Sequence, residues 1–336
     1  MKTKTCLRTT FAIVTVWTAV GRIEAQAQPA WFNPSTPGTR CCFGMVFDPA
    51  VNSTLLFGGY GGPNNPDLGD TWVLGEGGWF QLSPANSPPP RSGSGMAYDA
   101  TTKTVVLFGG NARNGAGDLN DTWIWNGTNW TQVFPPVSPP ARRWDTQGMA
   151  YHAPSGKVVL FGGVTAGGAM FGDTWIWDGT TQTWTQQSPL SSPAPRRAPL
   201  AYDPATETIV LFGGEGGYGG PLYGDTWTWN GTNWHQRSPA NSPPPRSMAS
   251  MAFDAQLRRL VLFGGSGAGS SYPFYNDAWT WDGMTWTQLS PGSGPPERYA
   301  FGMSYDARDQ AVVLYGGLDL YDTVVLSDMW ILATAP

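Results

Sequence analysis

Residues 95–135 read GMAYDATTKTVVLFGGNARNGAGDLNDTWIWNGTNWTQVFP, and this stretch decides the fold. A β-branched run, TVVLF, ends in two glycines, and the later run DTWIW alternates as a half-buried strand does. The dipeptide Asn126-Gly127 favours a two-residue hairpin turn. The stretch therefore predicts four short antiparallel strands, called a to d in chain order, over residues 96–99, 104–108, 121–125 and 130–133.

The same pattern recurs along the whole chain. Phe-Gly-Gly or Tyr-Gly-Gly closes strand b of every copy, at steps of 51 to 53 residues. A fixed period near fifty residues indicates one unit copied many times, and four antiparallel strands per unit are typical of a propeller blade. We therefore predict an all-β, six-bladed β-propeller. Its double glycines are Gly58-Gly59, Gly109-Gly110, Gly162-Gly163, Gly213-Gly214, Gly264-Gly265 and Gly316-Gly317.

The sixth copy lacks strand d, because its pattern ends at Ile331-Leu332-Ala333. A spare strand lies at the other end of the chain, where Ala30–Pro34 has the form of a fourth strand. We predict that this N-terminal strand completes blade six. Such pairing closes the ring and removes two exposed sheet edges. Residues 28–336 then form one propeller domain.

Residues 1–27 have the pattern of an export signal. A basic start precedes an apolar stretch from Phe11 to Val20 and the cleavage signature Ala25-Gln26-Ala27. A disordered or membrane-anchored N-terminus is the alternative, but this apolar stretch is too short to span a bilayer. We predict a secreted protein, extracellular or periplasmic, with no membrane span. The net charge of −5 argues against nucleic acid as a partner.

Cysteine use is sparse. Cys6 lies in the predicted signal, so the neighbours Cys41 and Cys42 are the only cysteines of the predicted mature chain. Adjacent cysteines form either a strained vicinal disulfide or two small buried residues. The sequence leaves their redox state open.

Over residues 31–332, the Phe/Tyr-Gly-Gly motif and the Trp-led strand after it resemble the kelch repeat. The repeats are similar to those of secreted kelch proteins that resemble the central domain of galactose oxidase. This resemblance implies a six-bladed kelch propeller. It does not imply oxidase activity, because the copper site of galactose oxidase needs histidines and a tyrosine-linked cysteine, whereas His152 and His235 fall in different blades. We predict no metal and no cofactor.

Every copy carries an aspartate at the start of strand c and an arginine at the end of the connection between strand d and the next blade. In an antiparallel blade both positions lie on one face. Their opposite charges predict repeated salt bridges or arginine–carbonyl bonds. The alternative is a cationic ring around the central opening, suited to a carboxylate-bearing ligand. The structural repeat aspartates are Asp70, Asp121, Asp173, Asp225, Asp277 and Asp328, and the arginines are Arg40, Arg91, Arg142, Arg196, Arg246 and Arg298.

Departures from the repeat are a better guide to function, because packing explains the consensus. Blades three and four depart most: the segment that leads into blade three is longer, and Glu215 directly follows a double glycine. Loops on a rigid scaffold often carry binding residues. We therefore predict a ligand site on the face of the b–c and d–a connections, with ordinary loop drift as the alternative. Its candidate residues are Arg142, Arg143, Trp144, Asp145, Glu215, Tyr218 and Tyr223.

These observations favour a secreted binding module that recognises a glycan or protein ligand and has no chemistry of its own. The alternative is a carbohydrate-active enzyme such as a sialic acid mutarotase-like epimerase. In that enzyme Glu215 would serve as acid and base, with nearby arginines on the substrate carboxylate. No motif selects catalytic residues, and whether the chain is an enzyme stays open. A purely structural surface protein is the third interpretation.

Overall fold

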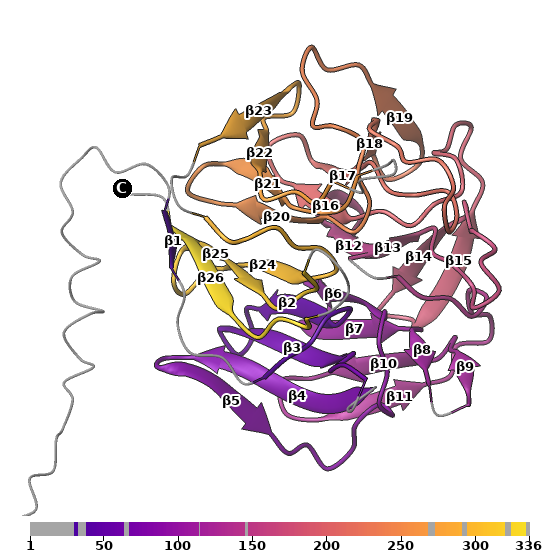
Figure 1. The fold of residues 1–336 in the computed structure, drawn as a ribbon. Coiled ribbons are helices and arrows are strands. Elements are labelled where there is room, and N and C mark those ends of the chain that lie inside the picture. Colours follow the sequence, from indigo (N-terminus) through magenta and orange to yellow (C-terminus); the bar gives the residue numbers. More distant parts are fainter. Residues whose placement is uncertain are drawn as a thin grey trace, which may run out of the picture.

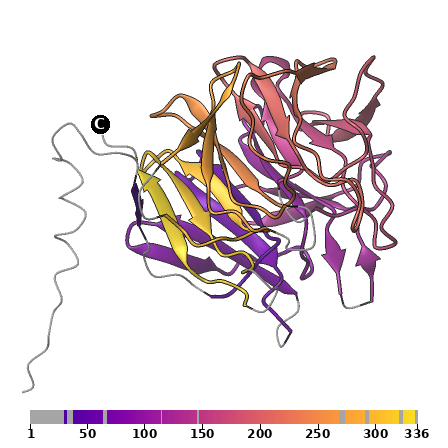
Figure 2. The same ribbon diagram turned by 45° about the horizontal axis from the view of Figure 1, so that its top comes forward.

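The computed structural model describes residues 30–32, 38–63, 67–113, 115–144, 147–267, 273–290, 294–319 and 324–333. Within these ranges the only helix is one short 3-10 turn, η1 (Ala153–Ser155). Six four-stranded antiparallel sheets surround a common axis like the blades of a propeller (Figure 1). The turned view shows neighbouring sheets packed face to face (Figure 2). The predicted six-bladed all-β fold is confirmed.

In blades one to five the strands run outward from the axis in chain order. Blade one contains β2 (Gly44–Asp48), β3 (Ser53–Gly59), β4 (Leu68–Gly75) and β5 (Gly78–Leu82). Blade two contains β6 (Gly95–Asp99), β7 (Thr104–Phe108), β10 (Thr122–Trp125) and β11 (Trp130–Val133). Its b–c connection forms an extra hairpin from β8 (Asn111–Ala112) and β9 (Gly117–Asp118). Blade three contains β12 (Met149–His152), β13 (Lys157–Phe161), β14 (Thr174–Asp178) and β15 (Thr183–Gln187).

The remaining blades repeat this order. Blade four contains β16 (Leu200–Asp203), β17 (Thr208–Phe212), β18 (Thr226–Trp229) and β19 (Trp234–Arg237). Blade five contains β20 (Ser250–Asp254), β21 (Arg259–Phe263), β22 (Ala278–Trp281) and β23 (Trp286–Leu289). Blade six contains β24 (Gly302–Asp306), β25 (Ala311–Tyr315), β26 (Met329–Ala333) and, as its outer strand, β1 (Ala30–Phe32).

The tryptophans of strand d join neighbouring blades. Trp184 of blade three is buried, and its indole N–H donates to the Thr122 hydroxyl of blade two at 3.0 Å. The same bond recurs from Trp130 to Thr71, from Trp234 to Thr174 and from Trp286 to Thr226. A buried indole with a satisfied N–H contributes a large apolar surface without an unpaired donor. These repeated tryptophans therefore hold the blades together.

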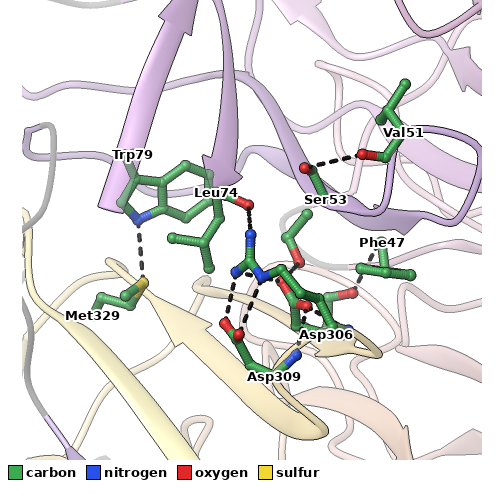
Figure 3. A network of polar contacts seen from close by, with 11 residues as sticks. Phe47, Val51, Ser53, Leu74, Trp79, Asp306, Asp309 and Met329 are labelled. Carbon is green, nitrogen blue, oxygen red and sulfur yellow. Dashed lines mark hydrogen bonds and ion pairs between the residues drawn. The ribbon is translucent and has the colours of Figure 1, made fainter. Parts of the chain in front are cut away.

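The ring closes between blades six and one, as the sequence predicts. Strand β1 pairs antiparallel with β26, with Trp31 opposite Leu332. The seam also carries polar contacts of its own (Figure 3). The Phe47 N–H donates to Ser304 Oγ at 2.9 Å, and the Arg308 guanidinium donates to the Leu74 carbonyl at 2.6 Å. At this seam the acceptor of the strand-d tryptophan is a sulfur atom and not a threonine hydroxyl: the Trp79 indole N–H donates to the Met329 sulfur at 3.1 Å. Both chain ends thus contribute to one blade.

Residues 1–29 lie outside the described residues, so the export signal stays a prediction. In the part of the chain that the structure describes, no helix is long and apolar enough to cross a bilayer.

Candidate functional site

The propeller has two faces. We call the face with the b–c and d–a connections the loop face, and the face with the a–b and c–d turns the turn face. The six repeated arginines and aspartates all lie under the loop face. Each arginine pairs side by side with its aspartate, and the distances from Nη1 to Oδ1 lie between 2.5 and 2.9 Å. The pairs are Arg40–Asp70, Arg91–Asp121, Arg142–Asp173, Arg196–Asp225, Arg246–Asp277 and Arg298–Asp328.

Further bonds complete this layer. The same arginine Nη1 donates to the carbonyl of the first glycine in each double glycine, at 3.0 to 3.1 Å. The other carboxylate oxygen accepts the indole N–H of the tryptophan two residues on, as Asp173 does from Trp175 at 2.7 Å. The predicted salt bridges are present. Because these guanidinium groups are buried and already paired, they do not form an open cationic ring.

Three of the predicted ligand residues meet in one cluster over blades two to four. Arg143 donates to Asp118 at 2.6 Å and to the Tyr218 hydroxyl at 2.8 Å. Arg197 donates from Nε to Glu215 at 2.7 Å, and its guanidinium lies 5.1 Å from the centre of the Tyr218 ring. We call Asp118, Arg143, Arg197, Glu215 and Tyr218 the loop-face cluster. It ties together connections that are far apart in the sequence.

The other predicted ligand residues have different places. Arg142 belongs to the buried pair with Asp173. The Tyr223 ring packs 3.6 Å from the Arg196 guanidinium, so it shields that ion pair. Trp144 is 0% exposed, and its indole N–H donates to the Phe161 carbonyl at 3.1 Å. Trp144 therefore packs in the core and offers no exposed ring to a ligand. Asp145 lies outside the described residues.

The geometry limits what the loop-face cluster does chemically. The Glu215 side chain is bound to Arg197 in a pair that is largely buried. Because its carboxylate already accepts hydrogen bonds from Arg197, Glu215 is not available as a free general acid or base. Within the described residues, no group of three or more His, Cys, Asp or Glu side chains is placed to hold a metal ion. His152 lies on the turn face, where it bonds Ser155 and the Glu207 carbonyl, and burial lowers its pKa.

A cavity of about 410 Å³ lies on the axis. Near the loop face its wall is a ring of buried side chains, Met45, Met96, Met149, Leu200, Met251 and Met303. Near the turn face its wall is a ring of half-buried aromatic residues, Phe47, Tyr98, Tyr151, Tyr202, Phe253 and Tyr305. The greater exposure of the aromatic ring places the mouth of the cavity on the turn face. The sequence did not single out this cavity.

Gln147 closes the cavity toward the loop face. Backbone bonds link neighbouring blades there, from Cys42 to Ala300 at 2.9 Å and from Gly93 to Cys42 at 2.6 Å. Blade four joins this region differently: only three residues separate Arg196 from Leu200, where four separate Arg246 from Met251, and the Leu200 N–H donates to the Gln147 carbonyl at 2.8 Å. The longer connection of blade three fills that place: the side chain of Gln147 crosses to the Met303 carbonyl of blade six and accepts from Ser250 of blade five at 3.0 Å. The irregular segment that the sequence predicted to be a ligand loop therefore supplies the side chain that closes the cavity on this face.

Asp118 was missed in the sequence because it lies in β9, within a b–c connection for which the repeat pattern predicts no strand. The feature of the sequence that could have identified Asp118 is an acidic residue in a glycine-rich b–c connection. Arg113 was missed as well: it stacks 4.1 Å from the Tyr60 ring at the edge of blades one and two.

Comparisons with known proteins agree with this architecture. Residues 44–235 match the model of the KLHDC2/KLHL20/DRC7 Kelch-repeats domain. Adagio protein 3 of Arabidopsis thaliana is 30% identical over 187 residues, which are 52% of this chain and 29% of that protein. An F-box/kelch-repeat protein of the same plant is 32% identical over 188 residues, 49% of this chain and 38% of that protein. Human Kelch domain-containing protein 1 is 28% identical over 141 residues, 40% of this chain and 33% of that protein.

The match therefore spans less than two fifths of each of these relatives. Among solved structures, YjhT superposes with a TM-score of 0.68 at 17% identity, covering 89% of this chain and 97% of that one. At that identity the likeness shows the fold alone. The family match covers more than half of the chain and includes the double-glycine repeats of four blades. The chain belongs to the kelch-repeat family.

Proposed function

We propose that this propeller binds a protein partner through the loop face over blades two to four, and that it has no chemistry of its own. The observation that carries the proposal is Tyr218, which is 58% exposed although Arg143 and Arg197 hold it in place. Tyrosine and arginine are the residue types that contribute most to protein interfaces. Membership of the kelch-repeat family supports the same class of function. Export through residues 1–27 belongs to this proposal and rests on the sequence pattern alone.

The cluster also has the rigidity that an interface needs. The Arg143–Asp118 ion pair and the Arg143–Tyr218 hydrogen bond together link connections of three blades, so these loops are ordered before a partner arrives. A surface that is already ordered loses less conformational entropy on binding. Tyr218 can then present its ring edge and face without rearrangement.

Tyr218→Ala is expected to weaken partner binding at least about tenfold, because truncating an interface anchor commonly costs roughly 2 kcal/mol or more. The matched control is Met284→Ala, since Met284 is 82% exposed in a c–d turn on the opposite face. Both variants and the parent chain are immobilised in one orientation. Proteins from the medium or compartment of the source cell are captured and quantified by mass spectrometry. The partner found is then titrated by calorimetry.

A partner that is lost with Met284→Ala and kept with Tyr218→Ala would contradict the choice of face. Equal binding to both variants would remove Tyr218 from the interface.

A carbohydrate ligand is the second candidate, and the axial cavity is the observation that favours it. Its lining carries no formal charge and combines aromatic rings with hydroxyl and amide groups. Such a lining suits an uncharged, hydroxylated ring of monosaccharide size. The epimerase alternative has less support, because its acid and base, Glu215, is held by Arg197.

Neutral monosaccharides are expected to bind the parent chain more tightly than glucuronic acid does, and Tyr202→Ala is expected to weaken that binding several-fold. Saturation-transfer NMR measures both. Tyr218→Ala is the control, because it lies on the loop face and should leave sugar binding unchanged. Loss of sugar binding in Tyr218→Ala alone would instead favour the loop face as the glycan site.

A further inference from the structure

The two adjacent cysteines lie on the loop face, where blade one begins. Their sulfur atoms are 3.2 Å apart. Cys41 is buried, and Cys42 is half-buried. An apolar cluster that includes Tyr60, Tyr299 and Leu318 packs around the pair. Cys42 is therefore the more accessible residue of the two, and its sulfur is in contact with that of Cys41.

The fold itself brings these sulfurs together. Cys41 exchanges two backbone hydrogen bonds with Tyr60, at 2.8 and 2.9 Å. Cys42 donates to the Ala300 carbonyl and accepts from the Gly93 N–H. All four backbone groups of the pair are therefore fixed by neighbouring segments. Little backbone freedom remains to separate the side chains.

The backbone of Cys42 is also in a left-handed conformation, with φ of 56°. The equivalent residues of other blades share it: Gly93, Met248 and Ala300 have φ of 68°, 53° and 55°. The conformation is thus imposed by the ring of inter-blade bonds and not by sulfur chemistry. A non-glycine residue is strained in this conformation, and the fold already contains that strain at Cys42, Met248 and Ala300.

We propose that Cys41 and Cys42 form a reversible thiol–disulfide site, oxidised to a vicinal disulfide by small-molecule disulfides such as oxidised glutathione. The Cys42 thiolate attacks one sulfur of the reagent, forms a mixed disulfide and releases one thiolate. The Cys41 thiol then loses its proton, attacks Cys42 Sγ and releases the second thiolate. Two protein thiols thus give up two electrons to the reagent, and their two protons pass to the two thiols released.

The order of attack follows from exposure, because the buried Cys41 cannot meet the reagent first. The hydrogen bond with Cys41, followed by burial, raises the pKa of the Cys42 thiol well above its ordinary value. The thiolate is the attacking species, so the exchange is slow near neutral pH. Adjacent residues on a trans peptide have Cα atoms only about 3.8 Å apart, closer than in most disulfides. The disulfide is therefore strained and is readily reduced again.

The test incubates the full chain with oxidised glutathione for several hours, unfolds it in denaturant with excess N-ethylmaleimide to block free thiols, and then digests it with trypsin. Trypsin releases Cys41 and Cys42 together in the peptide 41–91, separate from Cys6. We expect this peptide to lose two hydrogen atoms, to carry no glutathione and to resist alkylation by N-ethylmaleimide. After treatment with a monothiol, the same peptide should take up two maleimide groups.

Single variants distinguish a working pair from two unrelated thiols. Cys41→Ser removes the resolving thiol, so Cys42 should keep one glutathione as a trapped mixed disulfide. Cys42→Ser leaves only the buried thiol, which should stay unmodified in the folded chain. Two free thiols in the parent peptide after oxidation would overturn the proposal. So would equal glutathione uptake by both variants, or retention of glutathione on the parent chain. Thermal melting of each variant verifies that it is folded.

Discussion

Asp277→Asn is expected to lower the free energy of unfolding by about 3–5 kcal/mol, because it leaves a buried guanidinium without its carboxylate. Arg246 is 1% exposed, and it bonds both oxygens of Asp277 at 2.6 and 2.9 Å. The Tyr275 ring covers the guanidinium from 4.0 Å, so water cannot replace the lost partner easily. The Trp279 indole N–H also donates to Asp277, at 2.7 Å.

Asp254→Asn in the same blade is the matched control. Asp254 is more deeply buried than Asp277. Its Oδ2 has no hydrogen-bond partner, and its Oδ1 accepts from the N–H groups of Gln256 and Leu257. Asparagine keeps that acceptor and carries no charge. Burial raises the pKa of Asp254. Its charge therefore opposes folding at neutral pH. The substitution should change stability by less than about 1 kcal/mol, or increase it.

The two carboxyl groups also have opposite effects on acid stability. Burial alone would raise the pKa of Asp277, but the hydrogen bond and the charge of Arg246 lower it below the ordinary value. A lowered folded pKa gives stability that is present above the unfolded pKa, about 3.9, and is lost as pH falls through the folded value. The raised pKa of Asp254 has the reverse sign, so protonation of Asp254 favours the fold in acid.

Urea denaturation at pH 7 and at about pH 3 measures these effects. The difference in free energy of unfolding between Asp277→Asn and the parent chain should be smaller in acid. The parent chain then loses the same ion pair, because Asp277 becomes protonated. If Asp277→Asn and the parent chain have equal free energies of unfolding at pH 7, the Arg246–Asp277 ion pair contributes no net stability. A large loss in Asp254→Asn would show that the charge on the turn face is needed.

Deletion of residues 28–37 is expected to cause aggregation or a loss of several kcal/mol, because it removes β1 from blade six. The deletion removes the hydrogen bonds between β1 and β26, and each such bond contributes roughly 0.5–1.5 kcal/mol net. An open sheet edge also pairs readily with other chains. The seam between blades six and one would keep backbone bonds such as Cys42 to Ala300 and side-chain contacts such as Arg308 to Leu74.

A synthetic peptide of residues 28–39 supplies the control. Added in excess, it should pair with β26 and restore the melting temperature of the shortened chain. A peptide of the same composition in scrambled order should not. Differential scanning calorimetry and size-exclusion chromatography follow both effects. A shortened chain that melts like the full chain and stays monomeric would refute closure through β1.

Much of the architecture was predictable from the sequence because the same pattern occurs six times, which resolves the secondary structure that a single copy leaves ambiguous. Any one run such as TVVLF is compatible with several structures, but six copies with equal spacing leave one arrangement. The missing fourth strand of blade six and the spare strand at residues 30–34 then predicted closure. The ion pairs followed from charge and position, since the aspartate and the arginine of each copy fall on one face of an antiparallel blade.

Only the tertiary structure decided what the irregular residues do. Arg143, Glu215 and Tyr218 stand out equally with Trp144 in the sequence. The first three meet in the loop-face cluster, whereas Trp144 packs in the core. Whether a departure from a repeat faces solvent or fills a gap depends on the neighbouring blades. Blade three is longer where blade four is shorter, and Gln147 occupies the space that results. Such compensation joins segments that the chain separates, so it has no local signal. The two cysteine sulfurs likewise meet because inter-blade hydrogen bonds fix the backbone on both sides of them.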